Sequence, residues 1–185
     1  MGNTFDQKKM ITRDDCLLVI IDAQEKLMPA LSHGDEITAN LVRLAQFSRI
    51  IGFPVIVTEQ EKLGATLTVI KDHLSGLEPV KKVHFNCFSS HDFNDRILAS
   101  GRKTIILAGA EAHICVAQTA LGAPAGYTVH VAADAISSRT VQNREIALRR
   151  MLHAGCVITS TEMFMYEILR KAGTDEFKAV LPLVK

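Results

Sequence analysis

Short, continuous apolar runs alternate with longer amphipathic stretches along most of the chain. A run such as residues 16–22 is typical of a strand that is buried on both faces of a parallel sheet. Apolar residues at helical spacing, such as those within residues 37–51, predict an amphipathic helix, and Gly52 marks its end. The pattern predicts strands at residues 16–22, 53–58, 103–108, 127–132 and 156–159, a short extended segment at 83–88, and helices at 37–51, 91–100, 114–123, 140–154 and 160–172.

The order of these elements predicts the architecture. Strands that alternate with helices form right-handed βαβ crossovers and a parallel sheet covered on both faces. The predicted fold class is α/β, a three-layer α/β/α sandwich with a central, mainly parallel, Rossmann-like sheet of roughly six strands. The 185 residues fit one domain, residues 1–185, in which residues 1–14 form an N-terminal extension. Residues 60–83 have no clear period, and no element is predicted there.

Composition and charge argue against several classes of protein. Lys and Arg total 21, Asp and Glu total 20, and the net charge is +1, so the usual electrostatic footprint of a nucleic-acid-binding protein is missing. No apolar run reaches the roughly 18–20 residues that a membrane helix needs. The N-terminal residues have no apolar core of a secretory signal, so the expected location is the cytoplasm.

The four cysteines form no Cys-x-x-Cys pair and no zinc-ligand cluster. In a reducing compartment they are expected to be free thiols. Cys16 and Cys156 fall inside predicted strands and are interpreted as small core residues. The role of Cys87 is left open.

Asp22 and Cys115 follow predicted strands at the place where open α/β sheets bind ligands. Asp22 is either a cap or ion-pair partner, the commoner role of a single Asp, or a general base beside a cleft. Cys115 comes one short turn after the strand at 103–108, in the first turn of a predicted helix, where the helix N-terminus lowers a thiol pKa. It is either a nucleophile or a buried core residue.

Lys82 lies in the segment KKVHFNCF. A pair of lysines is normally a solvated surface feature. The functional alternative is that Lys82 holds a thiolate and an anionic intermediate by its charge.

Four stretches, in this order, resemble the isochorismatase-like cysteine hydrolases over residues 15–172. LLVIIDAQEKL resembles the first strand of that family and carries Asp22, and KVHFNCF is similar to its Lys-x-x-Phe-Ser-x-Phe segment and carries Lys82. GAEAHICV resembles the nucleophile turn and carries Cys115, and VHVAADAISSRT resembles the strand and Asp-Ala-x-x-Ser-Arg segment that follow. The resemblance implies a three-layer α/β/α fold and a catalytic triad of Asp22, Lys82 and Cys115.

The resemblance also implies a cis peptide between Ala110 and Glu111, which would aim the amides of Glu111 and Cys115 at one point, an oxyanion hole. The nicotinamidases of this superfamily carry a metal-binding Asp-x-His after the second strand. Here the corresponding stretch begins Thr-Glu-Gln at residues 58–60 and contains no Asp-x-His, so neither a catalytic metal nor a cofactor is predicted. The stretch is similar to a branch of isochorismatase-domain proteins whose substrates are mostly unassigned. Two further departures are Asn86, where Ser is commoner, and Pro124, which interrupts the helix after the nucleophile.

The implied activity is hydrolysis of a C–N bond of amide type in a small molecule, through a thioester on the cysteine. Two alternatives stay open: a non-catalytic binding or scaffold protein of the same fold, and an RNA-processing protein, against which the near-neutral charge argues. A homo-oligomer is expected, with the apolar residues 179–184 available to cover a neighbour. The candidate substrate contacts are Leu27, Gln60, Phe85, Phe88, His113 and Ile114. Packing would also explain most of them, and His113 is alternatively a polar group whose hydrogen bonds are satisfied by the turn.

Overall fold

A computed structural model describes residues 10–74 and 76–185. Residues 1–9 of the predicted N-terminal extension therefore lie outside the described residues. Its described part packs on the domain, because Ile11 is buried in the core and its backbone N–H donates a hydrogen bond of 2.6 Å to the Glu167 carboxylate.

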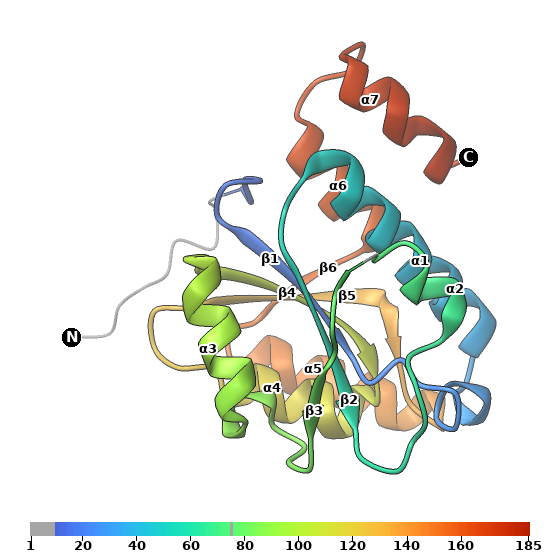
Figure 1. Ribbon diagram of the computed structural model, residues 1–185, viewed down its shortest axis with the longest axis vertical. Coiled ribbons are helices and arrows are strands. Elements are labelled where there is room, and N and C mark those ends of the chain that lie inside the picture. The colour runs from blue at the N-terminus through green and yellow to red at the C-terminus, as the bar shows by residue number, and fades with distance from the viewer. Residues whose placement is uncertain (1–9, 75) are drawn as a thin grey trace.

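Six parallel strands form one sheet in the order β3-β2-β1-β4-β5-β6, which confirms the predicted parallel, Rossmann-like sheet (Figure 1). β1 and β4 lie in the middle, and all their residues are buried, as their continuous apolar sequences predict. The strands are β1 (Cys16–Ile21), β2 (Val55–Gln60), β3 (Val80–Lys82), β4 (Thr104–Ala110), β5 (Thr128–Ser137) and β6 (Val157–Thr159).

Helices cover both faces of the sheet, so the three-layer α/β/α architecture is confirmed (Figure 1). One face packs against α1, α2, α6 and α7, and the other packs against α3, α4 and α5. Alternate residues of β1 point into the two cores. Leu18 and Ile20 pack in the core under α1, and Leu17 and Val19 pack in the core under α3. The helices are α1 (Gly34–Ile51), α2 (Thr68–Lys71), α3 (His91–Ser100), α4 (Ala117–Leu121), α5 (Val141–His153), α6 (Thr161–Leu169) and α7 (Asp175–Val180).

The edge strand β3 differs from the prediction, which placed an extended segment at residues 83–88. The strand lies at Val80–Lys82 instead, and residues 87–89 form a 3-10 turn. Backbone pairing with β2 places it, with Thr58 opposite Val80 and Gln60 opposite Lys82. Lys81 is exposed while Lys82 is buried, because successive side chains of a strand point to opposite faces.

The helix predicted at residues 114–123 is shorter and begins differently. A π-helical turn at Ala112–Val116 precedes α4, and α4 ends at Leu121. The helix therefore ends before Pro124, which cannot continue it. The side-chain amide of Asn86 lies against Gly122, where a Cβ would be only 2.3 Å from the Asn86 Nδ2.

The C-terminal segment packs against its own chain rather than being left free for a neighbour. α6 ends at Leu169, three residues before the predicted end, and α7 follows as an element that the pattern did not predict. Val180 is buried in the core beneath α1 and α6, and Leu183 and Val184 pack against the same core. This segment therefore gives no support to a homo-oligomer, which stays a prediction.

Within the described ranges, no helix combines the length and the apolar character that crossing a membrane would require.

His130 on β5 is a buried histidine whose Nδ1 has no hydrogen-bond partner among the residues that the structure describes. Burial lowers the pKa of His130 below its ordinary value, and the charge of Glu167 opposes this shift only in part. As the pH falls through the ordinary histidine pKa of about 6.5, the unfolded chain therefore takes up a proton that the folded chain binds more weakly. Lowering the pH therefore reduces the free energy of unfolding over the range between these two pKa values.

We expect the free energy of unfolding to fall by about 1–2 kcal/mol more between about pH 7 and about pH 5 in the natural chain than in His130→Phe. Urea unfolding at both pH values measures this difference. The exposed His91, changed to Asn, is the control and should retain the full pH dependence. Equal pH dependence in the natural chain and His130→Phe would show that His130 does not carry the effect.

Candidate active site

The carboxyl ends of four neighbouring strands bring the candidate catalytic side chains together. Asp22 follows β1, Lys82 ends β3, and Cys115 lies in the π-helical turn that follows β4. β2 lies between β1 and β3, and its last residues reach the same place. The structure therefore unites the three residues that the sequence singles out, although 60 residues separate Asp22 from Lys82 and 33 separate Lys82 from Cys115.

Asp22 is fully buried and its carboxylate has two strong partners. The Thr58 hydroxyl donates to Oδ1 at 2.6 Å, and the Lys82 ammonium donates to Oδ2 at 2.7 Å. The backbone of Asp22 is left-handed, with φ of 49°, so the chain leaves β1 in a sharp bend. Both carboxylate oxygens of this buried side chain thus have a hydrogen-bond donor, as a buried charge requires.

Lys82 contributes a buried ammonium group, and its side chain is 0% exposed. Three acceptors surround Nζ: Asp22 Oδ2 at 2.7 Å, Gln60 Oε1 at 2.8 Å and Cys115 Sγ at 3.7 Å. Burial lowers the pKa of Lys82, but the negative charge of Asp22 and its hydrogen bond outweigh that effect with the help of the two nearby thiols, so the pKa is raised. Lys82 therefore stays protonated beside the thiol.

Cys115 is a free, buried thiol. Burial raises the pKa of Cys115 well above that of an ordinary thiol; the Asp22 carboxylate raises it further, and the Lys82 ammonium opposes both. The expectation of a lowered thiol pKa at this turn is therefore wrong. Its basis was an N-terminal helix turn, but α4 has only five residues and the sulfur lies in the core.

Hydrogen bonds to Glu111 hold the turn before Cys115 in place. The peptide bond between Ala110 and Glu111 is cis, at the position where the resemblance implies one. The Glu111 carbonyl accepts hydrogen bonds from the backbone of Ile114 at 3.0 Å and of Val116 at 3.2 Å. The Glu111 carboxylate is buried and accepts from the backbone N–H and the guanidinium Nε of Arg139, at 2.9 and 3.2 Å. This pair ties the turn that carries Cys115 to the segment that follows β5.

The six candidate substrate contacts lie in different surroundings. Phe85 is 50% exposed just beyond Lys82, whereas the Phe88 ring packs edge-on against Phe93, with ring centroids 5.2 Å apart. His113 is partly exposed, and its Nδ1 lies 2.9 Å from the Ser138 hydroxyl. Leu27 and Ile114 are partly buried against the two cores. Phe88 thus belongs to an aromatic cluster.

Gln60 is the sixth of these residues, and its side-chain amide is already paired within the protein. Its Oε1 accepts from Lys82, and its Nε2 donates to the Val83 carbonyl at 2.8 Å. Two residues that sequence reasoning did not assign to the site support it: Thr58, which binds Asp22, and the fully buried Gln24, which binds the Gln60 backbone. The sequence offered a signal for Thr58, because it is the last residue of the strand predicted at 53–58. It offered none for Gln24.

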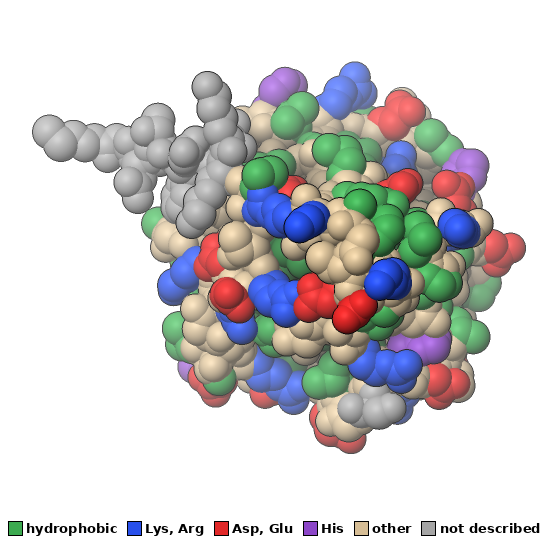
Figure 2. Space-filling view, turned by 90° about the horizontal axis from the view of Figure 1, so that it is seen from above, with side chains coloured by type: hydrophobic (Ala, Val, Ile, Leu, Met, Phe, Trp, Pro, Cys, Tyr) green, Lys and Arg blue, Asp and Glu red, His purple; other side chains and the backbone are tan. Residues whose placement is uncertain are grey.

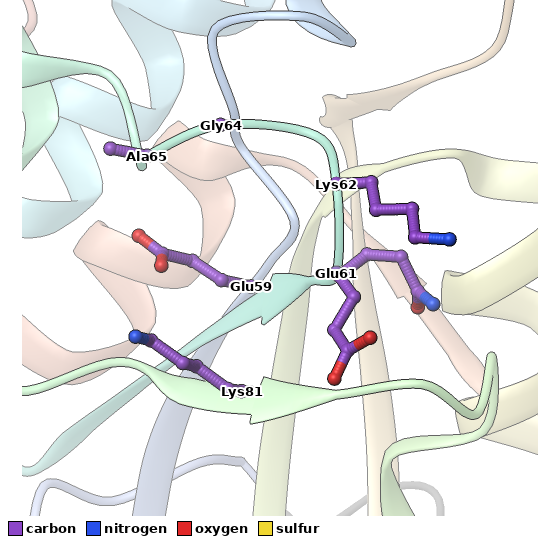
Figure 3. Close-up of a pocket in the computed structure, with 7 residues that line it drawn as sticks. Glu59, Glu61, Lys62, Gly64, Ala65 and Lys81 are labelled. Carbon is purple, nitrogen blue, oxygen red and sulfur yellow. The ribbon is translucent and has the colours of Figure 1, made fainter.

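A cavity of about 390 Å³ opens beside this network, between the loop after β2 and the strand β3 (Figure 3). Glu59 and Lys81 project to the same side in Figure 3, as expected for cross-strand partners. The lining mixes two glutamates with two lysines and includes neither the carboxylate of Asp22 nor the thiol of Cys115. The cavity lining is Glu59, Gln60, Glu61, Lys62, Gly64, Ala65 and Lys81.

Across the described part of the chain, no three His, Cys, Asp or Glu side chains gather as metal ligands. The chemistry available from the described site is that of a thiol, a carboxylate and an ammonium held within hydrogen-bonding reach. A carboxylate can take a proton from a thiol, and a fixed ammonium can stabilise the negative charge that then develops on sulfur.

Comparisons with known proteins find chains that are similar to this one in sequence and in fold. The isochorismatase domain matches residues 16–163. The secreted isochorismatase effector Isc1 of Phytophthora sojae is 35% identical over 184 residues, which cover 91% of this chain and 84% of that protein. The solved MAR1 ribonuclease from Caenorhabditis elegans is 31% identical, with a TM-score of 0.88 over 95% of this chain and 92% of that one.

A second solved structure is YcaC from Pseudomonas aeruginosa with hexane-2,5-diol and covalent acrylamide. It is 25% identical to this chain, with a TM-score of 0.89 over 97% of this chain and 93% of that one. The span matched by the family domain contains all six strands and the three side chains that meet at their carboxyl ends. The chain therefore belongs to the isochorismatase domain family.

Proposed function

We propose that this protein is a cysteine hydrolase that cleaves a C–N bond of amide type in a small molecule, with Asp22, Lys82 and Cys115 as its catalytic residues. Family membership supports a hydrolase-like function. The observation that carries the proposal is the buried Lys82 ammonium, 2.7 Å from the Asp22 carboxylate and 3.7 Å from the Cys115 sulfur. Perturbed titratable groups that meet at strand ends favour a catalytic role over a purely structural one.

The first half of the reaction forms the thioester. Cys115 begins as a neutral thiol, because burial and Asp22 raise its pKa. As the sulfur attacks the carbonyl carbon, Asp22 takes the thiol proton, and the Lys82 charge stabilises the sulfur as it loses that proton. The backbone amides of Glu111 and Cys115 hold the oxyanion of the tetrahedral intermediate. Asp22 then gives its proton to the nitrogen of the leaving amine, and the C–N bond breaks.

The second half releases the acid. A water molecule attacks the thioester carbon while Asp22 takes one of its protons. The carbon–sulfur bond breaks, and the proton returns from Asp22 to Cys115, so the site ends as it began. Neither a metal nor a cofactor takes part in the proposed reaction. The residues that remain as proposed substrate contacts are Leu27, Phe85, His113 and Ile114.

Covalent trapping on a panel of small amides tests the proposal. We expect at least one amide to release its amine and, after an acid quench, to leave an acyl group on Cys115 that intact mass and peptide mapping detect. Cys156→Ser, which changes another buried thiol, should behave like the natural protein. Turnover that persists in Cys115→Ser without any acyl adduct would contradict the proposed mechanism, and inertness toward the whole panel would favour a binding or scaffold protein.

A ribonuclease is the second candidate, because the C. elegans structure with 31% identity is a MAR1 ribonuclease. The charge distribution favours the first candidate. Figure 2 shows one face on which Lys and Arg side chains are interspersed with Asp and Glu, and the net charge of the whole chain is only +1. Cleavage of a labelled RNA that is lost in Cys115→Ala would establish the second function in place of the first.

A further inference from the structure

We infer that Gln60 is a positioning residue, which holds the Lys82 ammonium between Asp22 and Cys115, and not a contact to substrate. The inference rests on the proposed function, because it assigns Gln60 a role in the chemistry of Lys82 and Cys115. It also gives the Thr-Glu-Gln sequence at the end of β2 a physical role. Thr58 and Gln60 point to the same side of the strand, and each binds one member of the catalytic ion pair.

The side-chain amide of Gln60 can be placed in only one orientation. Its Nε2 donates to the Val83 carbonyl at 2.8 Å, and its Oε1 accepts from Lys82 at 2.8 Å. A flip of the amide would put an NH₂ group against an ammonium and a carbonyl oxygen against another carbonyl oxygen, so both hydrogen bonds would be lost. Both ends of the amide are thus engaged within the protein, and these two hydrogen bonds fix its oxygen toward the Lys82 ammonium.

The backbone of Gln60 is fixed as well, by the fully buried side chain of Gln24. The Gln60 N–H donates to Gln24 Oε1 at 2.8 Å, and Gln24 Nε2 donates to the Gln60 carbonyl at 3.0 Å and to the Gly64 carbonyl at 2.6 Å. Gln24 lies two residues after Asp22, so one side chain connects the strand end that carries Asp22 with the one that carries Gln60. The acceptor for Lys82 is therefore held by a rigid frame.

The geometry of an ammonium explains why such an acceptor matters. Lys82 has three N–H donors in a tetrahedral arrangement. Two of them are directed at oxygens at 2.7 and 2.8 Å, which leaves the third for the Cys115 sulfur at 3.7 Å. A neutral amide fixes this arrangement without adding a second negative charge beside the sulfur. A carboxylate in the same place would oppose the loss of the thiol proton.

Two substitutions separate the position of the acceptor from its charge. Gln60→Met keeps the length of the side chain and removes the acceptor, and Gln60→Glu keeps an acceptor and adds a negative charge. The matched control is Lys81→Met on the same edge of the sheet, because the Lys81 side chain is exposed and successive side chains of a strand point to opposite faces. The readout is the rate at which iodoacetamide alkylates Cys115, followed by peptide mapping from about pH 7 to about pH 10, a range in which this rate follows the fraction of thiolate.

We expect Gln60→Met and Gln60→Glu to alkylate at Cys115 about tenfold more slowly than the natural protein, and Lys81→Met to stay within about twofold. Gln60→Met loses the placed ammonium, and Gln60→Glu gains a charge that disfavours the thiolate. If Gln60→Met does not fold, Gln60→Leu, which also removes the acceptor without adding a charge, tests the inference in its place. Alkylation of both variants at the natural rate over the whole pH range would overturn the inference.

The experiment distinguishes failure of this inference from failure of the proposed function, because alkylation requires no substrate. If no amide is hydrolysed but alkylation depends on Gln60, the positioning role stands and the hydrolase proposal fails. If a substrate is hydrolysed and Gln60→Met raises only its KM, with alkylation unchanged, Gln60 is a substrate contact and the positioning role is wrong.

Discussion

Replacement of Cys115 by alanine is expected to lower kcat/KM for the amide substrate by about 10⁴-fold or more, because removal of the nucleophile abolishes the covalent route. The remaining groups at the site can still bind the substrate, so a small residual rate is expected. The fold should survive, since alanine fits the space of a buried cysteine and loses only one sulfur atom, at a cost of about 1 kcal/mol. Steady-state kinetics and urea unfolding of the same preparation measure both effects.

Cys156→Ala is the matched control for this loss. Cys156 is a free thiol in the same core, buried to a similar degree, but it lies just before β6 and outside the network of Asp22, Lys82 and Cys115. It should lose a similar amount of stability and keep its kcat/KM. Retention of activity within about tenfold in Cys115→Ala would show that the chemistry does not pass through this sulfur.

Gly109→Ala is expected to reduce the free energy of unfolding by more than about 4 kcal/mol, which is enough to unfold much of a protein of ordinary stability. Gly109 has φ of 110°, a conformation that residues with a Cβ rarely adopt. A Cβ at this position would lie 2.0 Å from the Ile21 carbonyl oxygen and 2.7 Å from the Ile21 nitrogen, so the backbones of β4 and β1 would have to separate. Circular dichroism during thermal and urea unfolding measures the loss.

Gly155→Ala separates backbone conformation from steric contact. Gly155 also has a positive φ, of 92°, but among the described residues no heavy atom beyond its two chain neighbours would lie within 4 Å of a Cβ at this position. Its substitution should cost about 1–2 kcal/mol, the usual penalty for a left-handed residue with a side chain. Equal losses in the two variants would mean that β1 and β4 separate easily and that the close contact at Ile21 is unimportant.

The central part of the fold could be predicted from the sequence because burial on both faces leaves a clear pattern. β1 and β4 have continuous apolar sequences, and α3 agrees with its predicted range of 91–100. β3 could not be located, because a three-residue edge strand with two lysines has no apolar run and depends on pairing with β2. The π-helical turn before α4 was missed for a similar reason, since its shape depends on tertiary contacts.

The candidate site, like the fold, could be predicted from the sequence only in part. Asp22 and Cys115 could be predicted because they follow recognisable strands, and the resemblance added Lys82. The pKa of Cys115 was predicted in the wrong direction, because the position of a residue in a turn does not reveal how deeply its sulfur is buried. The paired amide of Gln60 was equally hidden, since its two partners, Lys82 and Val83, lie 22 and 23 positions away along the chain.

The position of β3 at the edge of the sheet determines how the proposed site loses its geometry on heating. Lys82 belongs to a three-residue strand with one neighbour, whereas Asp22 and Cys115 follow central strands. Local opening of such an edge requires far less free energy than unfolding of the whole domain. Fraying of β3 would withdraw the ammonium and leave the carboxylate and the thiol in place. A sub-global opening is therefore expected to set the temperature at which the proposed catalytic site loses its geometry, and hydrogen exchange of the β3 amides reports this opening whereas the midpoint of global unfolding does not.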